Sequence, residues 1–404
     1  MQKESLAGIR VIDFTWAGAG PLATALLAYL GAEVIKIESM KRLDGTRLRT
    51  GQQGVAAASV NASTRFNDIN LNKLSITLNL RKPQAVEIVR RLAKVSDVAA
   101  ENFRAGVLNR LGLGYDVLSK ERPDLIMLSS SASGQTGPEA GQWGYASIFG
   151  AMSGLSHMTG YVDGPPMEMR LPMDFISAGT AAFVILAALN HRQRTGEGQY
   201  LDLSSREVIT CLIGDVLVDA ASNNHDPARA GNRDEIMAPH NCYPCKGKDK
   251  WVSIAIGSDA EWLAFRRAIG NPRWTADERF ADQLARWRNQ DALDKLIGGW
   301  TKNHAHFEVM NLLQKAGVAA VPSMSSEDMF KDPHLKARRF AQVVKHPEIG
   351  KQTVLGAPYK MSVTPPRIKR HGPLLGEHND YVIGEVLGIS KKEIASMVEE
   401  EVVV

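Results

Sequence analysis

Cysteine is scarce in this sequence, because 404 residues contain only three: Cys211, Cys242 and Cys245. Such an odd and sparse set gives no disulfide framework, so we expect a protein of a reducing compartment. A basic block is also missing, since 48 basic and 44 acidic residues are scattered along the chain for a net charge of +4. This balance argues against nucleic acid as a partner and suits a small anionic ligand.

Long apolar runs are missing as well. The longest apolar stretch, residues 181–189, is far shorter than the ~20 residues that cross a bilayer, so it predicts a buried helix and no membrane partner. Residues 1–5 contain no apolar signal region, and we therefore expect a cytoplasmic protein. The remaining composition, 44% hydrophobic and 23% charged, is typical of a globular protein long enough for two or three lobes.

Strand-like and helix-like segments alternate in the first half of the chain. Short apolar segments read as strands at residues 9–14, 32–38, 74–80, 98–101 and 124–129. Helical patterns at residues 21–29 and 84–92 lie between them. This alternation indicates an α/β fold with a mostly parallel sheet and helices on both faces.

A polar stretch without periodicity, residues 222–239, follows another predicted strand and helix, and we place a domain boundary there. Beyond it, residues 241–246 and 251–256 flank a turn and predict a hairpin. Helical patterns near residues 261–269, 290–301 and 306–316 complete a smaller α+β lobe. We therefore divide the chain at residues 222 and 325.

The first candidate motif is a glycine-rich turn. Gly18, Gly20 and Ala23 lie between the first strand and its helix, and Glu38 ends the next strand. The pattern imitates a dinucleotide fingerprint, although Pro21 removes an amide and Ala23 stands in for the third glycine. Two interpretations stay open: a tight turn with an exposed glutamate, or a helix N-terminus that binds a phosphate-bearing ligand.

The second motif, His240, Cys242 and Cys245, suggests zinc or redox chemistry. Structural zinc needs four ligands, and no further Cys or His pair stands at a suitable spacing. We therefore predict no metal, with the two cysteines as small side chains of a strand.

The third motif is Asp174, a lone carboxylate before a nearly uninterrupted apolar helix. Aspartate is a preferred N-cap, which is one interpretation. The other is covalent catalysis, because the same position sets a carboxylate against an apolar core.

Together the ordered motifs resemble the class III CoA-transferase family, which includes formyl-CoA transferase and carnitine CoA-transferase. The motifs are residues 8–14, 30–38, 72–78, 101–104, 110–115 and 195–202, together with Asp174. The resemblance implies a large Rossmann-like domain formed by residues 1–221 and 326–404, with a small domain at 222–325. It also implies two interlocked chains, as a homodimer or a heteromer with a related subunit.

In this family the catalytic aspartate, matched by Asp174, attacks the thioester of the acyl-CoA donor to give a mixed anhydride. The CoA thiolate then forms an aspartyl-CoA thioester, and the carboxylic acid acceptor reverses these steps. CoA thus enters as a substrate thioester, and no metal takes part.

The resemblance also assigns binding residues. Ala17, Asn102, Phe103 and Arg110 match family positions that hold the adenine and phosphate end of CoA. Lys73 and Arg104 are further candidates, for which a solvated cation beside a strand end is the alternative interpretation.

Acceptor candidates follow from residues 144–154 and 159–166, which look most like the branch that contains succinyl-CoA:benzylsuccinate CoA-transferase. An aromatic dicarboxylate then needs a cation, supplied by Arg47, Arg49 or Arg170, with Tyr145 and His157 lining the pocket; a structural histidine is the alternative for His157.

Several residues depart from the family pattern and narrow the expected substrate and reaction. Gly18 replaces a glutamine of formyl-CoA transferase, Ser39 replaces an arginine, and residues 229–239 lack its glycine-rich lid, so an oxalate-sized substrate is not expected. The family racemases carry a histidine where this chain has residues 144–148, which favours transfer over proton exchange. An acyl-CoA racemase or isomerase and a nicotinamide-dependent oxidoreductase remain the alternative functions.

Overall fold

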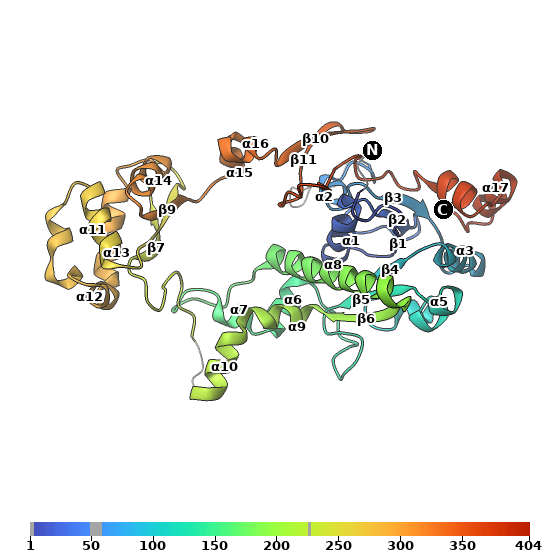
Figure 1. Ribbon diagram of the computed structural model, residues 1–404, viewed down its shortest axis with the longest axis horizontal. Coiled ribbons are helices and arrows are strands. Elements are labelled where there is room, and N and C mark those ends of the chain that lie inside the picture. Colours follow the sequence, from blue (N-terminus) through green and yellow to red (C-terminus); the bar gives the residue numbers. More distant parts are fainter. Residues whose placement is uncertain (1–3, 49–58, 225–227) are drawn as a thin grey trace. The chain divides into compact units, whose positions relative to one another are not determined.

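The computed structural model describes residues 4–48, 59–224 and 228–404 (Figure 1). These residues form two compact units. The first contains the residues up to Ser156, residues 168–224 and His334–Val404, and the second contains His157–Met167 and residues 228–333. The assignment of residues 157–167 differs from the sequence division, which placed this segment in the large domain.

The first unit is built on a six-stranded, all-parallel sheet. Its strands are β1 (Arg10–Asp13), β2 (Glu33–Glu38), β3 (Leu74–Thr77), β4 (Val98–Glu101), β5 (Ile126–Ser131) and β6 (Gln199–Ser204). They lie in the order β3-β2-β1-β4-β5-β6. This is the doubly wound order in which the strand sequence reverses next to β1, so ligand binding is expected at the carboxyl edge there.

Alternating side chains of each strand fill two apolar layers. On one face Val11 and Val98 pack with α1 (Ala19–Tyr29) and α8 (Arg170–Thr195), which lie side by side (Figure 1). On the other face Ile12 and Ala99 pack with helices α3 (Pro83–Lys94), α5 (Tyr115–Glu121) and α17 (Lys391–Glu399). Burial on both faces explains why these strands read as continuous apolar runs in the sequence.

Short helices and a second small sheet complete this unit. The helices are α2 (Thr64–Ile69), α4 (Val107–Arg110), α6 (Ala146–Met152), α9 (Ser205–Thr210), a 3₁₀ turn at Cys211–Ile213, α10 (Gly214–Asn223) and a π-helix at Asp380–Val386. Helices α7 (Leu155–Met158) and α16 (Pro333–Ala337) contain the boundaries between the units. An antiparallel hairpin of β10 (Ala341–His346) and β11 (Gly350–Leu355) lies in a stretch that the sequence pattern left unassigned.

Helix α8 is far longer than the apolar stretch that predicted it. Among the described residues, its segment Pro172–Thr195 alone is long and apolar enough to cross a membrane. Its residues Ala178, Ala182 and Ile185 are buried against α1 and the sheet. The sequence expectation of a core helix therefore agrees with the packing of its inner face.

The second unit has its own three-stranded antiparallel sheet and apolar core. Its strands are β7 (His240–Pro244), β8 (Trp251–Ala255) and β9 (Ala319–Pro322). Its helices are α11 (Asp259–Ala268), α12 (Gln283–Arg288), α13 (Gln290–Thr301), α14 (His306–Lys315), α15 (Ser326–Lys331) and 3₁₀ turns at Arg273–Ala276 and Glu278–Phe280. The predicted hairpin at residues 241–256 corresponds to the antiparallel pair β7 and β8.

Candidate active site

The loop that joins β1 to α1 lies at the carboxyl edge of the sheet. Asn102, which follows β4, accepts a hydrogen bond from the backbone N–H of Trp16 at 2.7 Å and donates one to its carbonyl at 2.8 Å. Ala17 has a φ of 63°, a left-handed conformation that costs a residue with a side chain about 1–2 kcal/mol. Asp44 accepts the N–H of Ala17 at 3.3 Å. Side chains that follow two different strands thus hold this loop in one conformation.

Lys73 belongs to the support beneath this loop. Its side chain is fully buried, and its ammonium group donates to Asp13 at 2.8 Å, to the carbonyl of Pro21 at 2.9 Å and to Asn70 Oδ1 at 2.9 Å. Burial lowers the pKa of Lys73 to about 8. An ammonium group has three N–H bonds, and all three are used here. In this arrangement no donor is left for a phosphate, so a structural role fits Lys73 better than the predicted contact with CoA.

Arg47 is also a structural residue. Its guanidinium is fully buried and donates to both carboxylate oxygens of Glu38, at 2.7 and 2.6 Å. It also donates to Asn61 Oδ1 and to the carbonyl of Pro373, and it lies 3.6 Å from the ring centre of Phe66. Because its donors are used inside the protein, Arg47 is a poor candidate for substrate binding. The same pairing explains why Glu38 is buried, whereas a ribose ligand of a dinucleotide site would be exposed.

Asp174 lies in the second turn of α8, because the helix begins at Arg170 and Met169 is its N-cap. The N-cap interpretation of Asp174 is therefore wrong. Its carboxylate approaches the N-terminus of α1, where an added Cβ on Gly18 would lie 2.3 Å from Oδ2. Only glycine leaves room for the side chain in this position.

The carboxylate of Asp174 is half-buried and has no hydrogen bond or ion pair with any residue in the described ranges. Burial raises its pKa above the ordinary value, and the charge of Arg65 opposes that rise. A poorly solvated carboxylate without a hydrogen-bond partner is a stronger nucleophile than a solvated one. Arg65, on the exposed side of α2, is the cation that the sequence reading missed, since it has no motif around it.

Aromatic rings and guanidinium groups surround the same loop. Trp16 and Phe103 meet edge to face with ring centres 5.8 Å apart. Arg42 lies 5.2 Å from the Trp16 ring, and Arg104 lies 4.7 Å from the ring of Trp143. Trp143 is 71% exposed. Exposed cations and rings in one place are suited to an anionic ligand with an aromatic base.

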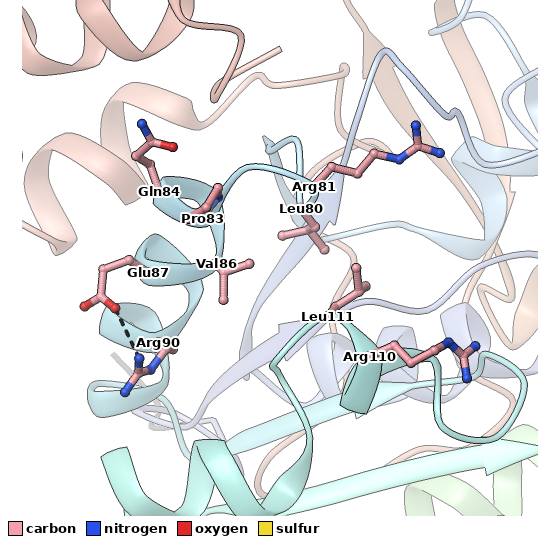
Figure 2. A pocket seen from close by; sticks show the side chains of 9 residues that line it. All are labelled: Leu80, Arg81, Pro83, Gln84, Val86, Glu87, Arg90, Arg110 and Leu111. Atoms are coloured by element: carbon pink, nitrogen blue, oxygen red, sulfur yellow. Dashed lines mark ion pairs between the residues drawn. The ribbon is translucent and has the colours of Figure 1, made fainter.

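Arg110 lies at a separate groove of about 830 Å³ in the first unit. The groove is lined by Leu80, Arg81, Pro83, Gln84, Val86, Glu87, Arg90, Arg110 and Leu111. Figure 2 shows that Leu80, Val86 and Leu111 point toward one another, while the side chains of Arg81 and Arg110 extend away on one side. Arg90 is paired with Glu87 and Glu121, so its charge is already compensated.

Comparisons with known proteins decide the family. The model of CoA-transferase family III matches residues 6–379. The chain belongs to this family. It is 33% identical over 399 residues to the succinyl-CoA–D-citramalate CoA-transferase of Chloroflexus aurantiacus, covering 98% of each chain. It is 32% identical over 402 residues to the beta subunit of succinyl-CoA–L-malate CoA-transferase of the same organism, again covering 98% of each.

A solved structure of a protein from the CaiB/BaiF family has the same fold as this chain. The crystal structure of a CaiB/BaiF family protein from Brucella suis superposes with a TM-score of 0.87 at 30% identity, covering 95% of this chain and 100% of that one. The protein is therefore a family III CoA-transferase with a mixed α/β fold on a parallel six-stranded sheet.

The remaining predicted substrate residues of this CoA-transferase are not gathered at Asp174 by any described contact. Tyr145 is 69% exposed and is the N-cap of α6. His157 is exposed and belongs to the second unit, where its carbonyl accepts a hydrogen bond from Arg229. Arg170 begins α8, and its side chain lies outside the described part, as does Arg49 entirely.

The cysteine motif of this CoA-transferase has no metal-like geometry. Cys242 and Cys245 are free thiols around strand β7, and burial raises the pKa of Cys245 to about 11. Within the described ranges no three His, Cys, Asp or Glu side chains are grouped as metal ligands. A thiol with a raised pKa is a poor nucleophile, which favours packing as the role of Cys245.

Proposed function

We propose that this family III CoA-transferase moves CoA from succinyl-CoA to a small dicarboxylic acid, with Asp174 as the covalent carrier. The observation that carries the proposal is the half-buried carboxylate of Asp174, which faces Gly18 and is left without a described hydrogen-bond partner. A carboxylate without a protein hydrogen-bond partner keeps its oxygens available to attack an electrophile. Such a carboxylate fits a group kept ready to react.

The chemistry balances in four steps. A carboxylate oxygen of Asp174 attacks the carbonyl carbon of the donor thioester, and the C–S bond breaks to give a mixed anhydride and CoA thiolate. The thiolate attacks the Asp174 carbonyl, which releases the donor acid and leaves an aspartyl-CoA thioester. The acceptor carboxylate attacks that thioester, and the thiolate then attacks the acceptor carbonyl of the new anhydride. Acceptor-CoA leaves, and the Asp174 carboxylate is restored.

The residues around Asp174 support this cycle. Gly18 gives the carboxylate access to the start of α1, where the N–H groups of Ala19 and Gly20 have no acceptor within their own helix; Pro21 has no N–H, and the N–H of Leu22 bonds to the carbonyl of Gly18. Such groups stabilise an oxyanion that forms next to them. Burial raises the pKa of Asp174 and so its basicity.

We assign the nucleotide end of CoA to the remaining predicted binding residues, which are Ala17, Asn102, Phe103, Arg104 and Arg110. Asn102 and Phe103 fix and flank Trp16, while Arg104 and Arg110 present exposed guanidinium groups. The glycine-rich turn then meets CoA and not a dinucleotide. Neither the family nor the relatives favour the nicotinamide-dependent or racemase alternatives.

The named relatives suggest the substrates. Both use succinyl-CoA by name, and their acceptors, D-citramalate and L-malate, are five- and four-carbon dicarboxylates. A dicarboxylate has one carboxylate to react and one to bind, and Arg65 supplies a cation close enough to act on Asp174. The expectation of benzylsuccinate as acceptor stays a prediction that the same substrate screen tests.

We expect the chain to act as part of an oligomer, either a heteromer with a related subunit or an interlocked homodimer. One relative is named as the beta subunit of its enzyme, which is consistent with a heteromer, and an interlocked homodimer is the other arrangement expected. Mass measurement of the purified protein under native conditions, alone and together with a co-expressed paralogue, distinguishes the two.

The deciding experiment incubates the protein with succinyl-CoA and malate, citramalate or benzylsuccinate and follows new CoA esters by mass spectrometry. We expect transfer to a dicarboxylate and, with donor alone, a hydroxylamine-sensitive adduct on Asp174. Asp174→Asn should fold and lose both. Because burial disfavours the charge of Asp174, this variant should be at least as stable as the wild type at neutral pH. Exchange of an α-hydrogen with deuterated water without an acceptor would show a racemase instead.

A further inference from the structure

Glu101, the last residue of β4, is a buried carboxylate for which the proposed mechanism has no use. It is 3% exposed. Its Oε2 accepts the backbone N–H of Phe103 at 2.6 Å, and the Ser129 hydroxyl on β5 also hydrogen-bonds to it. Burial raises the pKa of Glu101 to about 7. The side chain therefore changes charge near neutral pH.

The loop that Glu101 holds has only a few anchors. At its start Asn102 is bonded to Trp16, as described above. At its end the N–H of Gly106 reaches Gln135 Oε1 at 3.4 Å, and the backbone of Gln135 is held by Asp202 at 2.9 Å. Between them Glu101 accepts the N–H of Phe103, whose ring also packs edge to face against Trp16. This loop, residues 102–106, carries Phe103 and Arg104 toward the ligand edge.

We propose that Glu101 is a positioning residue whose ionised carboxylate holds residues 102–106 in the conformation that binds the nucleotide end of CoA, so that its protonation weakens CoA binding. The inference rests on the proposed function, because it takes CoA as the ligand of this loop. Glu101 itself does not touch the ligand in this proposal; it acts through the backbone of Phe103.

The direction of the expected pH effect on CoA binding follows from the strength of the hydrogen bond between Glu101 and Phe103. An ionised acceptor forms a shorter and roughly twice stronger bond with an N–H than a neutral one. Protonation of Glu101 therefore loosens Phe103 and lowers the share of molecules with the loop in its binding conformation. A purely Coulombic effect has the opposite sign, since a buried negative charge repels the phosphates of CoA.

Other groups around Glu101 influence the pH at which its carboxylate changes charge. Asp202 on β6 raises the pKa of Glu101 through its charge, and the Ser129 hydrogen bond lowers it. Tyr200, also on β6, shares the Ser129 hydroxyl and packs against Tyr115 of α5 with ring centres 5.5 Å apart. Burial raises the pKa of Tyr200 above its ordinary value, so this phenol stays neutral near pH 7.

The test measures the dissociation constant of dephospho-CoA by calorimetry between about pH 6 and pH 8. This ligand lacks the 3′-phosphate, a monoester that itself titrates near pH 6. In the wild type we expect binding to weaken about fivefold from pH 8 to pH 6, which corresponds to a one-unit difference in the pKa of Glu101 between free and bound protein. In Glu101→Gln the dependence should disappear, with the affinity at every pH close to that of the acidified wild type.

Two further variants separate positioning from a general loss of structure. Ser129→Ala removes a hydrogen bond that lowers the pKa of Glu101. The midpoint of the pH dependence of dephospho-CoA binding should therefore move to higher pH. Asp97→Asn alters a buried carboxylate just before β4, which holds the N–H of Arg10 at 2.7 Å; it should lower stability and leave the pH dependence of binding unchanged.

The outcomes are distinguishable. An unchanged pH dependence in Glu101→Gln, or tighter binding at low pH in the wild type, overturns the inference and leaves CoA transfer standing. A wild-type protein that binds neither CoA nor dephospho-CoA at any pH overturns the proposed function itself.

Discussion

The carboxylate of Asp174 occupies the space that a side chain at residue 18 would fill. A Cβ on Gly18 would lie 2.3 Å from Oδ2 and 2.8 Å from Cγ of Asp174. The two residues are far apart in the sequence, and they meet because α1 and α8 pack side by side through small residues such as Ala23 and Ala178. The reactive position of Asp174 therefore depends on a missing side chain in the β1–α1 loop.

Gly18→Ala should reduce turnover about tenfold or more while the protein stays folded. The added methyl displaces the Asp174 side chain from the first turn of α1, and a displacement of about 1 Å in a catalytic group costs up to 10²-fold. Steady-state CoA transfer and thermal unfolding of the same preparations measure the two effects.

Gly299→Ala is the matched control. Gly299 is in helix α13 of the second unit, and nothing lies within 4 Å of an added Cβ there. This change should raise stability by about 0.5–1 kcal/mol through the helix preference of alanine and leave turnover alone. Equal turnover in both variants would contradict the role given to Gly18.

Arg65→Met should move the acidic limb of the activity profile to higher pH. The charge of Arg65 lowers the pKa of Asp174 against the effect of burial, so its removal lets that pKa rise. The nucleophile must be ionised, and kcat/KM for the donor reports the free enzyme. The midpoint of log kcat/KM against pH is the measurement. Arg65→Lys should restore most of the wild-type profile, and the exposed Arg273→Met should not differ from wild type.

Lys73→Met should destabilise the protein by about 3–5 kcal/mol, because it leaves the buried carboxylate of Asp13 without its charge partner. Urea unfolding measures the loss, and adding Asp13→Asn should recover part of it. The exposed pair Lys41–Glu401 provides the comparison, since its loss costs at most about 1 kcal/mol. A folded Lys73→Met protein of normal stability with weak CoA binding would restore the phosphate role that the sequence suggested.

Arg110→Ala should reduce the preference for CoA over dephospho-CoA about tenfold, as expected for the loss of an ionic contact with the 3′-phosphate. Arg110 is exposed and lines the groove drawn in Figure 2, where its side chain extends to the same side as that of Arg81. Dissociation constants of the two ligands give the ratio. Arg90→Ala, which removes an arginine already paired with Glu121, should keep the wild-type ratio; an unchanged ratio in Arg110→Ala would place the 3′-phosphate elsewhere.

Local patterns were sufficient to locate strands β1 to β6 of the parallel sheet, but not β9, β10 and β11. β4 has the predicted bounds, Val98 and Glu101, because a strand buried on both faces is mostly a run of apolar residues, here Val98–Ala100. The start of α8 was not visible in the same way. Pro172 reads as a break, yet it lies in the first turn of the helix, where a missing N–H costs nothing. The local pattern therefore left two interpretations of Asp174 open, a helix cap and a catalytic carboxylate.

The charged residues show the limit of a sequence reading. Lys73, Arg47 and Arg104 were all candidates for binding an anionic ligand, but the first two are buried and paired while Arg104 is exposed. The partner of Lys73, Asp13, is 60 residues away, and the ligands of Arg47 include Pro373, 326 residues away. No local pattern records such partners.

The sequence by itself determined the alternation of strands and helices and the ordered motifs of the family, since both depend on residues close together in the chain. The tertiary structure alone decided which cations face the ligand edge, that Gly18 makes room for Asp174, and that Glu101 holds the loop after β4. These depend on burial and on contacts between distant segments, where the cost of an unpaired charge is set by the surrounding fold.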